Sequence, residues 1–342
     1  MIFAYESSDF FWTSYLPRNT RYYVPPAGLP AKLTTLLRGP PVRWHAGNPI
    51  HPLGDIPVQA TTALPFFPQG IAIEIKVGPN PRSSREHDGI GFRRGAVGTH
   101  TSRTMMLAEL TTLFDTVPAT AASHEIGAAI KQANCLGKAT TSTRRLTNQR
   151  LSELYSLDPA VSLYRVLRRL WAIDPAGRPL LAFLCAIARD PLLAASASAV
   201  IPLPIGNEFA RSPMKDAIRA AVHDRLNESI LDKVVRNAAS SWTQGGHLVG
   251  RTIKKRASVV ATPGVVAFAL YLSQAAGFHG QQIFTSGWAK LLDADASALK
   301  LLALDAKRAG LIDLRIAGDV FDISFNRLDP ATAASANGNN SV

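Results

Sequence analysis

From residue 105 onward, apolar residues recur at helical spacing and predict a series of amphipathic helices. The first three segments, with the residues expected to cap them, are 105–115 (Ser102 or Thr104), 123–134 (Ser123) and 144–155 (Ser142 or Thr143). Gly137 is a plausible end of the second helix. Helix, short glycine-containing turn and helix is the order of a helix-turn-helix motif.

Two further helices are expected to complete this lobe. The segment 162–173 has an apolar stripe with arginines around the other side, and the nearly all-apolar segment 180–189 is expected to form the core of the lobe. Asp190 and Pro191 would end the latter helix. The next residues, 194–211, are rich in Ala, Ser and Pro and read as a linker.

The C-terminal part predicts helices and a short hairpin. The expected helices are 213–222, 227–241, 263–276, 286–292 and 296–309, and the expected strands are 281–284, 311–316 and 320–325. Ser286 is expected to cap the fourth of these helices, Asp295 or Ala296 to open the fifth, and Gly310 to end it. The order from residue 263 onward resembles the winged-helix fold. The predicted fold class is therefore mainly α: a helix-turn-helix lobe, a C-terminal winged-helix lobe with a small β hairpin, and an irregular N-terminal arm.

The front of the chain has a different pattern. Residues 1–105 contain 13 of the 23 prolines, and only 71–77 reads as a strand. The expected divisions are an irregular proline-rich arm (1–104), a helix-turn-helix-like domain (105–193), a linker (194–211), a winged-helix-like domain (212–328) and a disordered tail (329–342). Alternatively, the native start of the protein lies between Gly89 and Met106, and residues 1–104 are an extension.

Charge and reactive residues narrow the function classes. The net charge of +12 favours an anionic partner, most commonly nucleic acid. The two cysteines and eight histidines form no metal-binding or catalytic motif, so we expect no metal, no cofactor and no enzymatic activity. No apolar run approaches the ~20 residues that span a bilayer, and there is no secretory signal, so a cytoplasmic protein without membrane contact is expected.

The basic residues suggest where nucleic acid would bind. The stretch from 144 to 169 contains six arginines and only two acidic residues, Glu153 and Asp158. A second basic run spans 251–256. The candidate contacts are Arg144, Arg145, Gln149, Arg150, Arg165, Arg168, Arg169, Arg251, Lys254, Lys255 and Arg256. Each of these can also be an ordinary solvated residue on a helix face.

The segment 240–250 allows two interpretations. Trp242, Gln244 and His247 beside Gly245 and Gly246 would suit a ligand or phosphate loop. Alternatively, Trp242 anchors a helix end and the glycine pair turns the chain. The second reading is favoured because the P-loop and dinucleotide-binding patterns are both missing.

Several of these segments resemble a known family. Arg144-Arg145-Leu146, the stretch 163–170 and the run Arg189 to Leu193, followed by a winged-helix lobe, are similar to the A protein of BREX phage-defence systems. The resemblance covers residues 105–325 and implies a pair of helix-turn-helix-like lobes that bind DNA. It also implies an accessory role among other defence-system proteins and no catalysis.

The expected function is therefore non-catalytic binding of double-stranded DNA, mainly through phosphates. The alternative is a protein-interaction scaffold, because the predicted helix 296–309 is unusually apolar for a DNA-recognition helix. The two differ in salt dependence, which is steep for phosphate contacts and weak for apolar ones.

Overall fold

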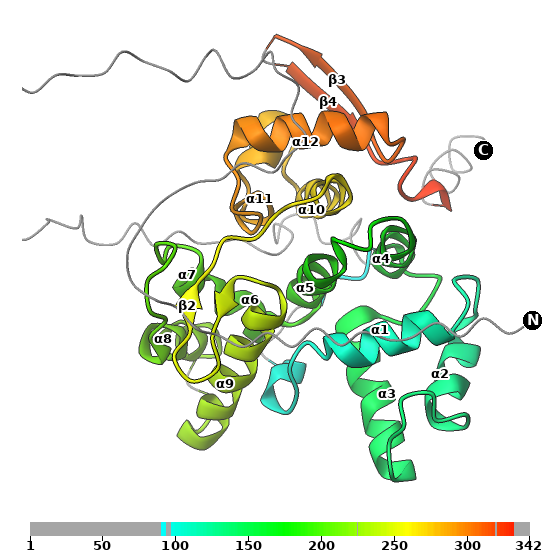
Figure 1. The fold of residues 1–342 in the computed structure, drawn as a ribbon, viewed down its shortest axis with the longest axis vertical. Helices are drawn as coiled ribbons and strands as arrows, with labels where there is room; N and C mark the ends of the chain where they lie inside the picture. The colour runs from blue at the N-terminus through cyan, green and yellow to red at the C-terminus, as the bar shows by residue number, and fades with distance from the viewer. Residues whose placement is uncertain (1–89, 94–96, 224, 319, 332–342) are drawn as a thin grey trace, which may run out of the picture. The chain divides into compact units, whose positions relative to one another are not determined.

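A computed structural model describes residues 90–93, 97–223, 225–318 and 320–331, all in one compact unit of the chain. This part is mainly α-helical and has two small antiparallel hairpins (Figure 1). The α-helices are α1 (Leu107–Thr116), α2 (Ser123–Lys131), α3 (Thr141–Tyr155), α4 (Ser162–Ile173), α5 (Arg178–Arg189), α6 (Pro191–Ala195), α7 (Ala197–Val200), α8 (Arg211–Ala221), α9 (Glu228–Gln244), α10 (Pro263–Ala275), α11 (Gly287–Lys290) and α12 (Ala296–Arg308). The strands are β1 (Leu248–Val249), β2 (Lys255–Arg256), β3 (Asp313–Ala317) and β4 (Val320–Ser324), and two 3-10 helices are η2 (Thr99–Thr101) and η3 (Gly280–Thr285).

Helix α5 lies at the centre of the described fold. Its residues from Leu180 to Arg189 are all buried, as its apolar sequence predicts. It contacts α3 and α4 on the N-terminal side of the sequence and α9 and α10 on the C-terminal side (Figure 1). One hydrophobic core therefore extends from Met105 to Leu328. The range 194–211, expected as a linker, contains the end of α6 and all of α7, with Ala197 and Val200 buried.

Helix α1 does not begin at either of its predicted caps. Helix α1 begins after Met106, whose φ is +55° and which provides no side-chain cap, so neither Ser102 nor Thr104 caps it. The backbone N–H of Met105 instead donates to Ser241 Oγ of α9, so a tertiary contact fixes the start of α1.

The other two predicted caps in this lobe are also displaced. At α2, Glu125 accepts the N–H of Ala122, so Ser123 is the first helical residue and not the cap. Helix α3 is capped by Thr140 and not by Ser142 or Thr143. The helices themselves are confirmed.

The C-terminal part follows the predicted order except at one element. Residues 281–284 were expected to form a strand, but they belong to the 3-10 helix η3. Ile283 and Phe284 are adjacent and both buried, which a helical turn allows, whereas an extended strand would point them to opposite faces. Ser286 and Asp295 cap α11 and α12, and the chain leaves α12 at Gly310, whose φ is +71°. Strands β3 and β4 pair antiparallel from Asp313 with Ser324 to Ala317 with Val320.

The second hairpin was not predicted. Strands β1 and β2 have two residues each, which is too short for a period-2 pattern in the sequence. Helix α9 extends through Trp242, which is buried and donates from Nε1 to Ser196 Oγ at 2.7 Å. Gly246 then turns the chain with φ +92°, so the structural interpretation of segment 240–250 is confirmed.

The predicted arm and tail lie largely outside the described residues, including the expected strand 71–77. The described residues 90–93 and 97–105 do contribute to the fold: Ile90 O accepts from Leu163 N, and Thr99 and His100 are buried. At the other end, Asp329 is buried against α4, although it was assigned to the tail. No single described helix is long and apolar enough to span a membrane, and α5 with α6–α7 reaches that length only as a pair bent by 102°.

Candidate nucleic-acid interface

The N-terminus of α3 has the chemistry of an anion-binding helix end. Thr140 caps it, and its Oγ1 accepts the N–H of Thr143 at 3.1 Å. Thr141 and Ser142, the first two helical residues, are exposed. Backbone N–H groups, the helix dipole and hydroxyl groups all favour an anion at this end.

Two arginines lie in the first turn of α3. Arg145 is exposed and has no hydrogen bond or ion pair within the described residues. Arg144 is half-buried, and its Nε donates to Lys138 O at 3.2 Å. Of the two, Arg145 is therefore the cation available to an external phosphate.

The other two predicted contacts on α3 are held by Glu153. Gln149 Nε2 lies 2.9 Å from Glu153 Oε1, and Arg150 Nη1 lies 2.8 Å from Oε2. Burial raises the pKa of Glu153, but the hydrogen bonds from Arg150, Thr99 and Gln149 outweigh that effect and lower the pKa overall. The charge of Arg150 is therefore compensated within the fold.

The three arginines of α4 stabilise the fold. Arg168 is buried over the Phe114 ring at 4.3 Å, and its guanidinium donates to Phe114 O at 2.8 Å and to Val117 O. It thus satisfies carbonyls at the C-terminal end of α1. Burial also lowers the pKa of Arg168.

The remaining arginines of α4 hold the C-terminal segment. Arg165 donates from Nε and Nη2 to the two carboxylate oxygens of Asp329, at 2.9 and 2.8 Å. Arg169 is exposed, but its Nη1 donates to Arg327 O. Although the sequence places these residues in its densest basic stretch, their guanidinium groups are directed to internal acceptors.

The basic run 251–256 also contains both residues with internal partners and residues that are exposed without them. Arg256 is buried and pairs with Asp293, with Nη1 at 3.0 Å from Oδ2, and its Nε donates to Val200 O at 3.1 Å. Lys254 is half-buried, and its Nζ donates to Thr243 Oγ1 at 2.8 Å. Arg251 and Lys255 are exposed, and their side chains have no internal partner in the part of the chain that the structure describes.

A buried polar network that was not predicted from the sequence resembles a catalytic triad. His100 Nδ1 lies 2.7 Å from Asp190 Oδ2, and His100 Nε2 lies 2.8 Å from Ser241 Oγ. All three residues are at most 1% exposed, and Ser241 Oγ already accepts the N–H of Met105. A substrate cannot reach this hydroxyl in the described fold, so the network ties η2 to α6 and α9.

The sequence signal for this network is confined to one residue. Asp190 precedes Pro191, as a helix cap often does, and Asp190 Oδ1 accepts the N–H groups of Leu192 and Leu193. His100 and Ser241 are 141 positions apart, and no periodic pattern connects them. A side chain at Gly98 would place its Cβ 2.1 Å from Asp190 Oδ1, so the close approach of η2 requires glycine there.

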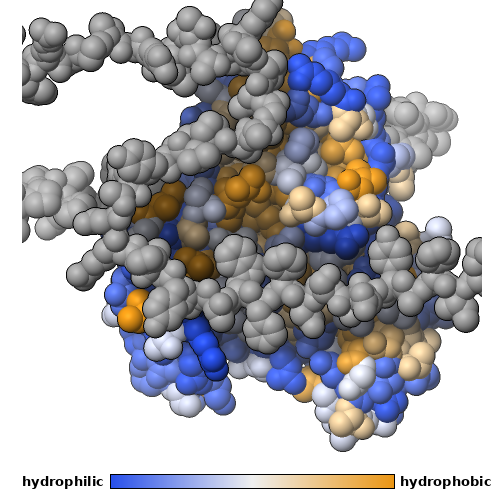
Figure 2. Space-filling view, viewed as in Figure 1, coloured by the Kyte–Doolittle hydropathy of each residue, from blue (hydrophilic) through white to orange (hydrophobic). Residues whose placement is uncertain are grey.

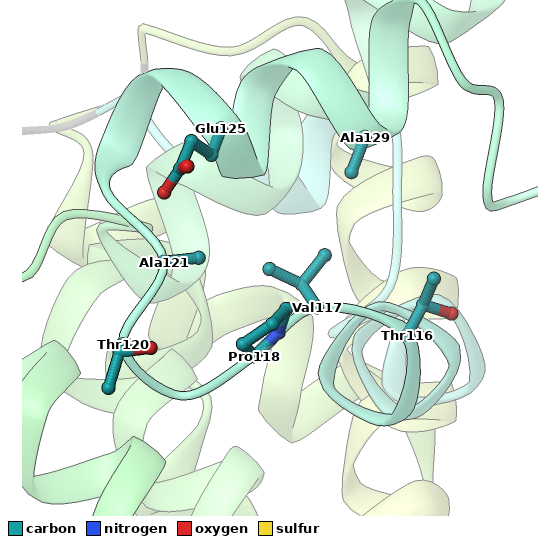
Figure 3. A pocket seen from close by; sticks show the side chains of 7 residues that line it. All are labelled: Thr116, Val117, Pro118, Thr120, Ala121, Glu125 and Ala129. Carbon is teal, nitrogen blue, oxygen red and sulfur yellow. The ribbon is translucent and has the colours of Figure 1, made fainter.

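Neither of two pockets lined by described residues adds a second candidate site. One lies between the end of α1 and α2, and Figure 3 shows Glu125 on one side of it and Val117 and Pro118 on the other. Glu125 is its sole ionisable side chain, and its carboxylate is already bound to Ala122 N. A second pocket, beside β3 and β4, mixes both charge signs, with Lys307 and Arg315 near Asp313 and Asp322. No group of three or more His, Cys, Asp or Glu residues in the described ranges could hold a metal ion.

The described geometry thus reduces the eleven predicted contacts to two exposed places, the start of α3 with Arg145 and the β1–β2 hairpin with Arg251 and Lys255. No protein-family model, curated protein or solved structure matches this chain.

Proposed function

We propose that this protein is a non-catalytic DNA-binding protein that contacts duplex DNA mainly through its phosphates. The observation that carries the proposal is that three of the basic residues singled out in the sequence are exposed and have no internal side-chain partner among the described residues: Arg145 beside the start of α3, and Arg251 and Lys255 on the β1–β2 hairpin. The net charge of +12 adds a long-range attraction for a polyanion.

Two parts of the fold would provide the binding lobes. Helices α2 and α3 pack together and correspond to a helix-turn-helix, with α3 as the recognition helix. Helices α10 to α12 with β3 and β4 correspond to a winged-helix unit in which η3 replaces the first strand. The segment between α2 and α3, residues 132–140, is longer than the usual three- to four-residue turn.

The biological role that fits this proposal is an accessory factor in a bacterial phage-defence system. It rests on the resemblance to the A protein of BREX systems, whose matching segments include the first turn of α3 and the α5–α6 junction. Catalysis is not part of the proposal, since the triad-like residues are buried. Other defence-system proteins are then the expected protein partners.

A protein-interaction scaffold is the second candidate, and one observation favours it. Leu301 on α12 is 65% exposed and Val320 on β4 is 68% exposed. The basic end of α12 is partly neutralised, because Arg308 pairs with Asp305. Exposed apolar residues such as these suit an apolar partner better than a DNA groove.

The two candidates separate in a salt titration. Fluorescence anisotropy of the full chain with a labelled duplex, between about 50 and 200 mM salt, should show a slope of log K against log salt of about −0.9 for each phosphate contacted. Arg145→Ala should lower affinity and reduce that slope by about 1. Exposed Arg236 on α9 also lacks an internal partner among the described residues, and Arg236→Ala is the matched control.

Each outcome decides between the candidates. A steep slope that Arg145→Ala reduces supports phosphate binding at α3. If no duplex binds even at the lowest salt, the exposed cations serve solubility, and the scaffold function is the better proposal.

A further inference from the structure

The β1–β2 hairpin is held firmly at its base. Backbone hydrogen bonds join it to the neighbouring segment, from Gly206 N to Arg256 O at 2.8 Å and from Phe209 N to Lys254 O at 2.8 Å. Beneath it, the buried guanidinium of Arg256 is bound by Asp293. The position of the hairpin is therefore fixed before any partner binds.

The tip between the strands also has a defined shape. Gly250 has φ +109°, and a Cβ there would lie 2.1 Å from Ile253 O, so the turn requires glycine. Lys254 Nζ donates to Gly250 O at 3.2 Å and to Thr243 Oγ1, which closes the turn against α9. Such a tip loses little conformational entropy on binding.

The surface of the hairpin combines apolar and cationic side chains. Val249 and Ile253 are each 58% exposed, and Arg251 between them is exposed and has no internal partner within the described residues. Lys255 is exposed at the base, where its backbone forms an isolated antiparallel β-bridge with Glu208. The face shown in Figure 2 is mainly hydrophilic around α8 and α9, beside this hairpin, with a few apolar residues among them.

We propose that this tip enters the minor groove of A·T-rich duplex DNA, with Arg251 in the groove and Ile253 against its wall. The inference rests on the proposed DNA binding and specifies which groove and which base composition the hairpin recognises. Strands of two residues each are too short to lie along the major groove, so only the tip can reach between the phosphates.

The residue types match this groove. A narrow A·T-rich minor groove has an enhanced negative potential, and arginine enters it more readily than lysine because a guanidinium is more weakly hydrated than an ammonium. Isoleucine is among the apolar residues that minor-groove proteins insert between base steps, so its side chain is suited to the inside of this groove. Contact with phosphates alone would leave the exposed Val249 and Ile253 without a role.

The test uses the full chain and two labelled duplexes of equal length, one A·T-rich and one G·C-rich. The wild type should prefer the A·T-rich duplex by about tenfold, and netropsin, which occupies the A·T minor groove, should displace it. Arg251→Lys keeps the charge and should remove most of this preference. Ile253→Ser should weaken binding to the A·T-rich duplex with little change in thermal stability, because Ile253 is largely exposed. Arg236→Lys on α9 is the control and should change neither the A·T preference nor the affinity for the A·T-rich duplex.

The outcomes distinguish failure of the minor-groove inference from failure of the proposed DNA binding. If the wild type binds neither duplex at low salt, DNA binding itself is wrong. If it binds both equally, with no competition from netropsin and no effect of Arg251→Lys, DNA binding stands and the minor-groove inference is overturned. Binding to phosphatidylserine-containing vesicles that is lost in Ile253→Ser, without an A·T preference, would also overturn it and assign the tip to a lipid surface.

Discussion

Single arginines in this protein differ in role although the sequence gives them similar surroundings. Arg168 and Arg169 are adjacent in α4, yet Arg168 is buried under the end of α1, and Arg169 is exposed. The helical period places both beside the apolar stripe and does not show which one a neighbouring helix will cover. Burial and hydrogen-bond partners decide the role, and both are properties of the fold.

Replacing Arg168 should therefore affect stability and leave DNA binding nearly unchanged. Arg168→Met leaves Phe114 O and Val117 O buried without a donor, which costs about 1–3 kcal/mol for each unsatisfied group. The free energy of unfolding measured in urea should fall by that order. Arg145→Met, at an exposed position, should change stability by less than about 0.5 kcal/mol. Unchanged stability in Arg168→Met would contradict the structural role.

His247 predicts a pH dependence of stability. Its ring is buried, with centroids 4.9 Å from those of Phe183 and Trp242, and Nε2 lies 2.8 Å from Leu291 O. Burial lowers the pKa of His247 from 6.5 to about 4; Leu291 O and Asp293 oppose this shift, and Arg256 adds to it.

Because the fold prefers neutral His247, this contribution to stability is complete above about pH 6.5 and is lost as the pH falls towards 4. The loss is on the order of 3 kcal/mol over that range. Urea unfolding at several pH values should show it in the wild type and not in His247→Gln. His124→Gln, at an exposed histidine of α2, should leave the wild-type pH profile unchanged. A profile in His247→Gln that still matches the wild type would exclude His247 as the titrating group.

At the scale of elements, the pair Arg256–Asp293 joins the hairpin to the turn before α12. Asp293 accepts from both terminal nitrogens of Arg256 and also from Val259 N at 3.1 Å. Both side chains are nearly buried, with 2% and 8% exposed. This pair attaches the hairpin to the C-terminal helices, together with the contact between His247 Nε2 and Leu291 O.

Asp293→Asn should destabilise the protein by roughly 3–5 kcal/mol, because the guanidinium then lacks its counter-charge. The double variant Arg256→Met with Asp293→Asn should be more stable than that single variant, as a double-mutant cycle in urea can show. Asp313→Asn is the matched control, since its pair with Arg327 is exposed and contributes about 1 kcal/mol or less. Equal losses for the buried and exposed pairs would argue against the hairpin attachment.

For the described unit as a whole, the continuous core predicts cooperative unfolding. Helix α5 packs against elements of both predicted lobes, so neither can lose its core without exposing α5. Hydrogen exchange followed by mass spectrometry through a urea series should deprotect peptides of α4 and α10 at the same urea concentration. Two separate midpoints would show that the lobes unfold independently.

The sequence predicted local structure better than it predicted sites. The apolar run of α5, the caps Ser286 and Asp295 and the β3–β4 hairpin follow from residues close together in the chain. The conformation of residues 281–284 and the first residue of α1 were predicted wrongly because tertiary contacts determine both. Tertiary contacts also removed several of the predicted DNA-contacting residues from the candidate site. Arg165 binds Asp329, which is 164 positions away, and Arg256 binds Asp293, which is 37 positions away.

The contact between Arg165 and Asp329 also sets limits on how far the protein can be shortened. A chain that ends at residue 328 would lose the two Asp329 oxygens that accept from Arg165, and one that starts after Ile90 would lose the carbonyl that accepts from Leu163 N. Both ends of the described unit are therefore anchored on the first turns of α4. The smallest fragment that keeps these hydrogen bonds runs from residue 90 to residue 329, which makes it the shortest one to test for independent folding.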